Sequence, residues 1–169
     1  SERAQQEGPE LVLLGSSITA HWDLARFFPG RRFLNVGIDG QYSGQLLLRF
    51  KHDVLDVRPK AVLLKLCEMN FSHEIPESVS LDNVIMMATL AQANGIKPYM
   101  ATTIPVSRQV KSESLAPAII NSRVKAFNET LAAFARRHHY TVVDLAAAMS
   151  DQEGYLREGL AVDGVHPSE

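Results

Sequence analysis

Short apolar runs alternate along the chain with longer segments in which apolar residues recur at helical spacing. The short runs cover residues 11–14, 32–36, 61–66, 98–103 and 141–145. Because these runs are continuous and do not alternate with polar residues, they are typical of strands buried on both faces, as in a parallel sheet covered by helices. The pattern therefore predicts five strands in one sheet.

Three longer segments between these runs have the periodicity of amphipathic helices. They cover residues 42–57, 79–93 and 119–139. Asn94 and Gly95 after the second segment are a helix-ending signal, and Arg136 and Arg137 suit the negative end of the third. The alternation of strands and helices predicts an α/β fold, a three-layer αβα sandwich with a five-stranded, mainly parallel sheet. We expect residues 1–169 to form a single domain.

Sheets of this kind carry their sites at the carboxyl ends of the strands, near the point where the strand order reverses. That rule selects residues 15–19, 37–43 and 67–73 as the segments in which to look for chemistry.

Composition narrows the range of partners. The 169 residues include 17 Lys and Arg against 19 Asp and Glu, for a net charge of −2. This balance provides no basic surface for nucleic acid or an anionic membrane. Apolar runs such as 61–64 and 84–93 are too short to cross a membrane. The polar start leaves the compartment open, because an export signal or anchor removed before residue 1 would make the domain extracytoplasmic. Oligomeric state is open too.

No cofactor or metal is expected from the motifs. The glycines at 37, 40 and 44 match neither a phosphate-binding loop nor a dinucleotide fingerprint, and no His-Glu-x-x-His pattern is present. The single cysteine, Cys67, excludes an internal disulfide and is interpreted as a buried core thiol. We expect Glu68, His73 and Glu74 to lie on a solvated loop.

The stretch "LVLLGSSITAHW", residues 11–22, places two serines where a strand turns into a helix. A hydroxyl at a helix start is either an N-cap or a nucleophile, and the second reading needs a base. Near the other end of the chain, "VDGVHP" places Asp163 three residues before His166. Such a pair supplies an imidazole base oriented by a carboxylate, although Asp-Gly also forms simple turns.

Together these motifs resemble the SGNH/GDSL hydrolases, which have a Gly-Asp-Ser block near the N-terminus and an Asp-x-x-His block near the C-terminus. The stretch "NVGIDGQYSGQLLLRF", residues 35–50, is similar to the second block of that family. The resemblance implies a flavodoxin-like fold and a catalytic triad of Ser17, His166 and Asp163. It also implies that the backbone N–H groups of Ser17 and Gly40 bind the oxyanion.

Two blocks depart from the family pattern. Ser16 replaces the aspartate beside the nucleophile. The third block, normally Gly-x-Asn-Asp with an oxyanion-binding asparagine, reads "LCEMNFSHE" here. A gapless match places Met69 at that asparagine, whereas a one-residue bulge would place Asn70 there. We expect Asn70 to be the third oxyanion donor, because methionine cannot donate a hydrogen bond.

The resemblance implies hydrolysis of small acyl esters, acetyl esters above all and among them those on carbohydrates, without metal or other cofactor. Two alternatives stay open from the sequence. One is a catalytically degenerate domain that binds an acylated glycan or a protein partner. The other is an O-acyltransferase that uses the same triad. Because the family continues past "HPS" into a further helix, we expect the C-terminal helix to be missing from this chain.

Overall fold

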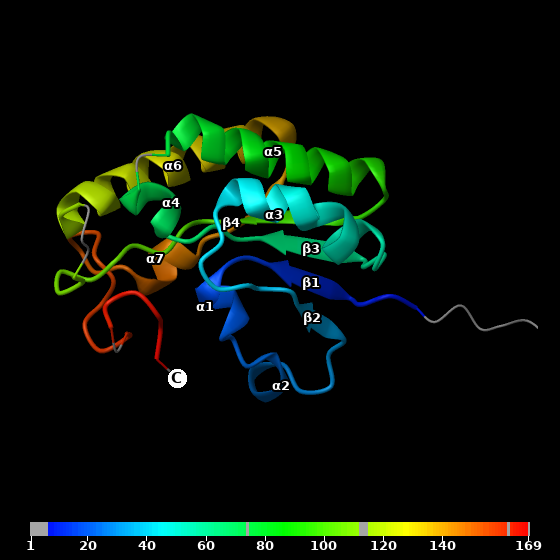
Figure 1. Cartoon of the computed structure of the whole chain (residues 1–169), viewed down its shortest axis with the longest axis horizontal. Helices are drawn as coiled ribbons and strands as arrows, with labels where there is room; N and C mark the ends of the chain where they lie inside the picture. Colours follow the sequence, from blue (N-terminus) through cyan, green and yellow to red (C-terminus); the bar gives the residue numbers. More distant parts are fainter. Residues whose placement is uncertain (1–6, 74, 112–114, 162, 169) are drawn as a thin grey trace, which may run out of the picture.

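Five parallel strands form one sheet in the order β2-β1-β3-β4-β5 in a computed structural model that describes residues 7–73, 75–111, 115–161 and 163–168 (Figure 1). The strands are β1 Leu11–Leu14, β2 Phe33–Asn35, β3 Ala61–Leu64, β4 Lys97–Ala101 and β5 Thr141–Val143. All four pairings are parallel, and β1 pairs with β3 over its whole length, from Leu11 opposite Ala61 to Leu14 opposite Leu64. The predicted α/β architecture is confirmed.

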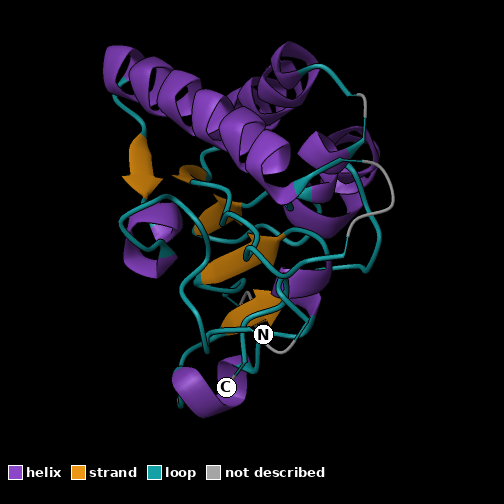
Figure 2. Ribbon diagram, turned by 90° about the vertical axis from the view of Figure 1, so that its left-hand side faces the viewer, coloured by secondary structure: helices purple, strands orange, loops and turns teal. Residues whose placement is uncertain are grey.

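Helices cover both faces of the sheet (Figures 1 and 2). On one face lie α3 Ser43–Phe50, α4 Met69–Ser72, α5 Glu77–Ala93 and α6 Pro117–His138. The smaller helices α1 Ser17–Ala20, α2 Leu24–Phe27 and α7 Leu145–Met149 belong to the other face, where Trp22, Leu24 and Leu145 pack against the sheet.

The two faces bury very different amounts of apolar surface. The main core packs the sheet against the long helices and includes Leu14, Leu64, Phe71 and Phe127, each at most 2% exposed. On the opposite face the fully buried cluster consists of Leu13, Leu63 and Ala101 among the described residues. The long helices therefore account for most of the hydrophobic stabilisation.

The helices differ in detail from the prediction. The segment predicted as one helix over 42–57 is α-helical only to Phe50 and continues as the π-helix η1, Lys51–Leu55. The one-turn helices α2, α4 and α7 have no counterpart in the prediction. Among the helices of the described residues, none has the length and apolar character needed to cross a bilayer.

The strand order brings the site segments together. From β1 the chain moves outward to β2, and then crosses back over β1 to reach β3. The loops after β1 and β3 consequently leave neighbouring strands in opposite directions, which is the arrangement that opens a crevice in doubly wound sheets. Ser17 follows β1 at this crevice, and Glu68 and Met69 follow β3.

Candidate active site

Ser17 is the first residue of α1 and follows β1 through a tight turn at Gly15. This turn requires a glycine. A Cβ at position 15 would lie 2.1 Å from the hydroxyl oxygen of Thr19 and 2.9 Å from the carbonyl oxygen of Lys65. The backbone therefore passes close to the end of β3, and this close approach fixes where the Ser17 hydroxyl emerges.

His166 and Asp163 meet Ser17 across 149 residues of sequence. The hydroxyl oxygen of Ser17 lies 2.8 Å from Nε2 of His166, and Nδ1 of the same ring lies 2.5 Å from Oδ2 of Asp163. With the Nδ1 proton donated to the carboxylate, Nε2 is the acceptor for the serine hydroxyl. The structure thus brings together the three residues that the two terminal motifs singled out.

The carboxylate of Asp163 is held by its own turn. Its Oδ1 accepts hydrogen bonds from the backbone N–H groups of Val165, at 2.9 Å, and His166, at 2.7 Å. Partial burial raises the pKa of Asp163, but hydrogen bonds from the His166 ring and from these two N–H groups outweigh that effect and lower its pKa to about 2. Asp163 is therefore ionised at neutral pH and favours the Nδ1–H tautomer of His166.

The turn that carries this pair is anchored to a neighbouring loop. The N–H of Ser107 donates to the carbonyl of Gly164 at 2.9 Å. Gly164 has a φ of +84°, and a Cβ there would lie 2.5 Å from the Ser107 hydroxyl oxygen. A glycine is thus needed for both the backbone angle and the close packing.

Gly40 lies beside Ser17 in the loop between β2 and α3. It has a φ of +73°, and a Cβ there would meet nothing within 4 Å. The next N–H along the chain, that of Gln41, donates to the hydroxyl oxygen of Ser16 at 3.1 Å. Ser16 is 1% exposed. Ser16, the residue before Ser17, therefore ties the Gly40 loop to the serine turn.

A cavity of about 480 Å³ opens at Ser17. Its described lining residues include Ser17, His21, Asp39, Gly40, Glu68, Met69, Ser72, His73, Val106, Lys111 and His166. His21 and His166 also line a second cavity of about 270 Å³, whose walls are mostly apolar. The two imidazoles are in edge contact, with ring centroids 6.3 Å apart.

The structure does not bring the Asn70 side chain to the Ser17 cavity. The Asn70 side chain is fully buried, its Oδ1 accepts from the N–H of Ser43 at 2.9 Å, and its Nδ2 donates to the carbonyl of Cys67 at 3.1 Å. Met69 lines the cavity instead, with its sulfur 3.8 Å from the Ser16 hydroxyl oxygen. The amide of Asn70 therefore points into the core and does not line the cavity.

Glu68 was expected on a solvated loop, but its carboxyl is largely buried at the cavity. One of its oxygens, Oε2, is buried and has no hydrogen-bond partner among the described residues. Burial raises the pKa of Glu68, while the charges of Lys65 and His166 act in the opposite direction. The position of Glu68 directly after β3, at the carboxyl end of a parallel strand, was the sequence signal that could have placed it at the site. Glu74 lies outside the described residues. The thiol of Cys67 is buried, as predicted.

Within the described part of the chain, no group of three or more His, Cys, Asp or Glu side chains is arranged to hold a metal ion.

A family model described as the GDSL-like lipase/acylhydrolase family matches residues 13–169. A Bacteroides fragilis NCTC 9343 protein assigned as an acylhydrolase has a similar crystal structure, with a TM-score of 0.84 and 29% identity over 94% of this chain and 78% of that one. The crystal structure of a GDSL-like lipase from Bacteroides thetaiotaomicron VPI-5482 has a TM-score of 0.81 and 26% identity over 94% of this chain and 79% of that one. The structure of an acetyl-xylooligosaccharide esterase from Geobacillus has a TM-score of 0.70 and 17% identity over 96% of this chain and 88% of that one. This similarity shows the fold alone. No curated protein matches the sequence.

Proposed function

Because the chain belongs to the GDSL-like lipase/acylhydrolase family, we propose that it is a serine hydrolase of small acyl esters that works through Ser17, His166 and Asp163. The observation that carries the proposal is the 2.8 Å separation between the Ser17 hydroxyl and Nε2 of His166. A nucleophile within hydrogen-bond distance of a base, itself oriented by a carboxylate, is the arrangement that acyl transfer requires.

In the proposed first step, Oγ of Ser17 attacks the ester carbonyl while Nε2 of His166 takes the hydroxyl proton. The tetrahedral intermediate then collapses, and His166 gives that proton to the departing alcohol oxygen, which leaves an acyl-enzyme. Water repeats the sequence, with His166 again as base, and releases the carboxylic acid. Asp163 stays ionised throughout and stabilises the imidazolium in both steps.

The oxyanion is bound in this proposal by the backbone N–H groups of Ser17 and Gly40. Both residues line the same cavity, and Ser17 stands at the N-terminal end of α1. With Met69 beside them, the cavity has no amide side chain at this position, and one missing oxyanion donor costs about 10²–10³-fold in kcat. We therefore expect a slower enzyme than one with a third donor.

We favour a short acyl group, such as acetyl, on a polar alcohol. The cavity of about 480 Å³ accommodates such an ester, and its lining includes Asp39, His73 and Lys111, which can hydrogen-bond to the hydroxyls of a carbohydrate.

The test is hydrolysis of p-nitrophenyl acetate, butyrate and octanoate by the wild type and by Ser17→Ala, His166→Ala and Asp163→Asn. We expect Ser17→Ala and His166→Ala to lower kcat by about 10³-fold or more and Asp163→Asn by about 10³–10⁴-fold. Matched controls are Ser72→Ala and His21→Ala, which remove a serine and a histidine from the same cavity. Unchanged turnover in Ser17→Ala would refute the proposal.

A second candidate is a binding domain for acylated ligands without turnover, and the observation that favours it is Met69 in place of an oxyanion donor. A serine-reactive fluorophosphonate separates the two. Mass spectrometry of the treated protein should find the label on Ser17 if the residue is an activated nucleophile. A wild type that is neither labelled nor active, but binds acetylated oligosaccharide in calorimetry, would be a binding domain.

A further inference from the structure

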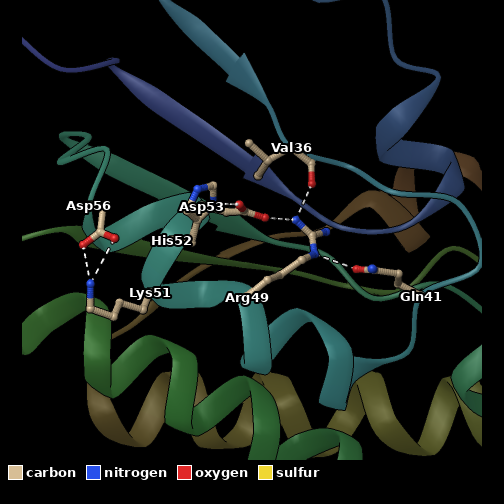
Figure 3. A network of polar contacts seen from close by, with 7 residues as sticks. All are labelled: Val36, Gln41, Arg49, Lys51, His52, Asp53 and Asp56. Carbon is tan, nitrogen blue, oxygen red and sulfur yellow. Dashed lines mark hydrogen bonds and ion pairs between the residues drawn. The ribbon is translucent and has the colours of Figure 1, made fainter.

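The guanidinium of Arg49 connects the turn after β1 with the loop between β2 and α3, beside the candidate site. Arg49 lies in α3, and its side chain is 14% exposed. It donates to the carbonyl of Val36 at 2.7 Å, to the carbonyl of Gly15 at 3.1 Å and to Oε1 of Gln41 at 2.6 Å. Figure 3 shows the guanidinium between Val36 and Gln41.

Each of these acceptors lies next to a part of the proposed machinery. Gly15 begins the turn that presents Ser17, and Val36 begins the loop that leads to Gly40. Gln41 follows Gly40 directly, and its N–H is bound by Ser16. The peptide between Gly40 and Gln41 is therefore held through the Gln41 backbone by the serine turn and through the Gln41 side chain by Arg49.

Asp53 holds the guanidinium from the other side. Asp53 belongs to the π-helix η1, its side chain is 16% exposed, and it forms an ion pair with Nη1 of Arg49 (Figure 3). Its second oxygen lies 2.7 Å from Nδ1 of His52. With its charge paired and its donors directed at fixed acceptors, the Arg49 side chain has little freedom to move.

We propose that Arg49 is a positioning residue that fixes Gly40 relative to Ser17, so that their two N–H groups converge on the oxyanion. This inference rests on the proposed hydrolase function. Because Met69 supplies no donor, binding of the oxyanion depends on backbone geometry alone. A displacement of about 1 Å in such a geometry costs about 10²-fold in rate.

The experiment compares Arg49→Met and Arg49→Lys with Lys51→Met as the matched control. Lys51 is two residues away and forms an exposed ion pair with Asp56 (Figure 3). We expect Arg49→Met to lower kcat by about 10²-fold with KM within about threefold, since substrate binding does not need the oxyanion contacts. Arg49→Lys should recover little, because a lysine cannot reach separate acceptors as a guanidinium fork does. Lys51→Met should match the wild type.

Two further measurements distinguish positioning from a loss of stability. Affinity for a trifluoromethyl ketone, which forms a tetrahedral oxyanion adduct, should fall in Arg49→Met in parallel with kcat/KM. Hydrogen exchange of the Gln41 amide should become about tenfold faster or more in Arg49→Met and stay unchanged in Lys51→Met. If Arg49→Met does not fold, Gln41→Ala removes the side-chain link alone and should lower kcat by about tenfold.

The outcomes separate this inference from the proposed function. Suppose that the wild type is active and labelled at Ser17, and that the kcat of Arg49→Met lies within threefold of the wild-type value. That result would overturn the positioning role and leave the hydrolase proposal standing. If Arg49→Met does not fold, the same result for Gln41→Ala would have the same meaning. An inactive and unlabelled wild type would overturn the hydrolase proposal and with it the catalytic role of Arg49. The exchange measurement would then report whether Arg49 still orders the loop.

Discussion

At the scale of single residues, short motifs predicted three side chains that the structure places within hydrogen-bond distance of one another, Ser17, His166 and Asp163. Ser17 and His166 were predicted because a nucleophile and a base leave local signatures at a strand end and in an Asp-x-x-His turn. The direction of the Asn70 side chain could not be predicted, because it depends on the course of the backbone after β3. Arg49 was not predicted at all, since its acceptors are a side chain and two carbonyls from separate segments.

Glu68 carries a prediction about stability and pH. Burial raises its pKa above the ordinary 4.5, against the opposing charges of Lys65 and His166. The unfolded chain therefore loses this proton at a lower pH than the folded chain does, and the free energy of unfolding falls as pH rises from about 4.5 through the folded-state pKa. We expect Glu68→Gln to gain stability relative to the wild type across that window, in urea unfolding series between pH 4 and pH 8.

Glu77→Gln is the control with the opposite sign. A hydrogen bond from Arg123 lowers the pKa of Glu77, so this carboxylate stabilises the fold above about pH 4.5 and loses that effect as pH falls through its folded-state pKa. Glu77→Gln should be less stable than the wild type at pH 7 and equal to it in acid. Parallel pH profiles for Glu68→Gln and the wild type would contradict the assignment of a buried, destabilised charge.

At the scale of elements, long periodic segments were predictable and single turns were not. The five strands and the helices α5 and α6 appeared in the hydrophobic pattern, with ends shifted by a few residues. Helices of four or five residues, such as α4 and α7, are too short to repeat a 3.6-residue period. The π-helix at residues 51–55 was likewise invisible, because its altered hydrogen bonding leaves the apolar stripe of the preceding helix intact.

The C-terminal end of α6 provides an element-scale prediction. His139 caps this helix in the left-handed region, with a φ of 60° and a ψ of 31°, which glycine adopts without strain. We expect His139→Gly to raise the free energy of unfolding by about 0.5–1 kcal/mol, since the strain removed exceeds the added chain entropy. His138→Gly, one residue earlier and inside the helix, should lower it by about 1 kcal/mol. Thermal unfolding of both variants checks these two predictions. A lower stability of His139→Gly would show that the contacts of the His139 side chain contribute more to stability than its backbone strain costs.

At the scale of the whole molecule, the parallel sheet explains how distant motifs form one site. Ser17 follows β1, and the His166 turn returns to the same edge after β5 and α7 (Figure 1). The rule that parallel strands present their carboxyl ends together predicted only the Ser17 side of this site, and the resemblance to the SGNH/GDSL hydrolases implied that His166 joins it. The sequence did not indicate how unequally the two faces of the sheet are packed, because continuous apolar strands look alike whether one face or both are fully covered.

Two adjacent leucines of β3 test the difference in packing between the two faces of the sheet. Leu64 is 2% exposed in the main core beneath the long helices, whereas Leu63 is 7% exposed on the opposite face and borders a cavity of about 350 Å³. Truncation at the tightly packed position removes more contacts and leaves a larger void. We expect Leu64→Ala to lower the free energy of unfolding by about 3–4 kcal/mol and Leu63→Ala by about 1–2 kcal/mol, measured by urea unfolding at pH 7.

The pair is matched in residue type, strand and neighbouring sequence, so helix and strand propensities cancel in the comparison. Equal losses from the two substitutions would mean that the helices α1, α2 and α7 pack as firmly as the long helices do. A larger loss from Leu63→Ala would reverse the picture and place the main stabilising core beneath the Ser17 helix. The expected order instead assigns global stability to the face of α3, α5 and α6, and leaves the face of α1, the helix that Ser17 begins, as the less densely packed side, where local adjustment costs the fold little.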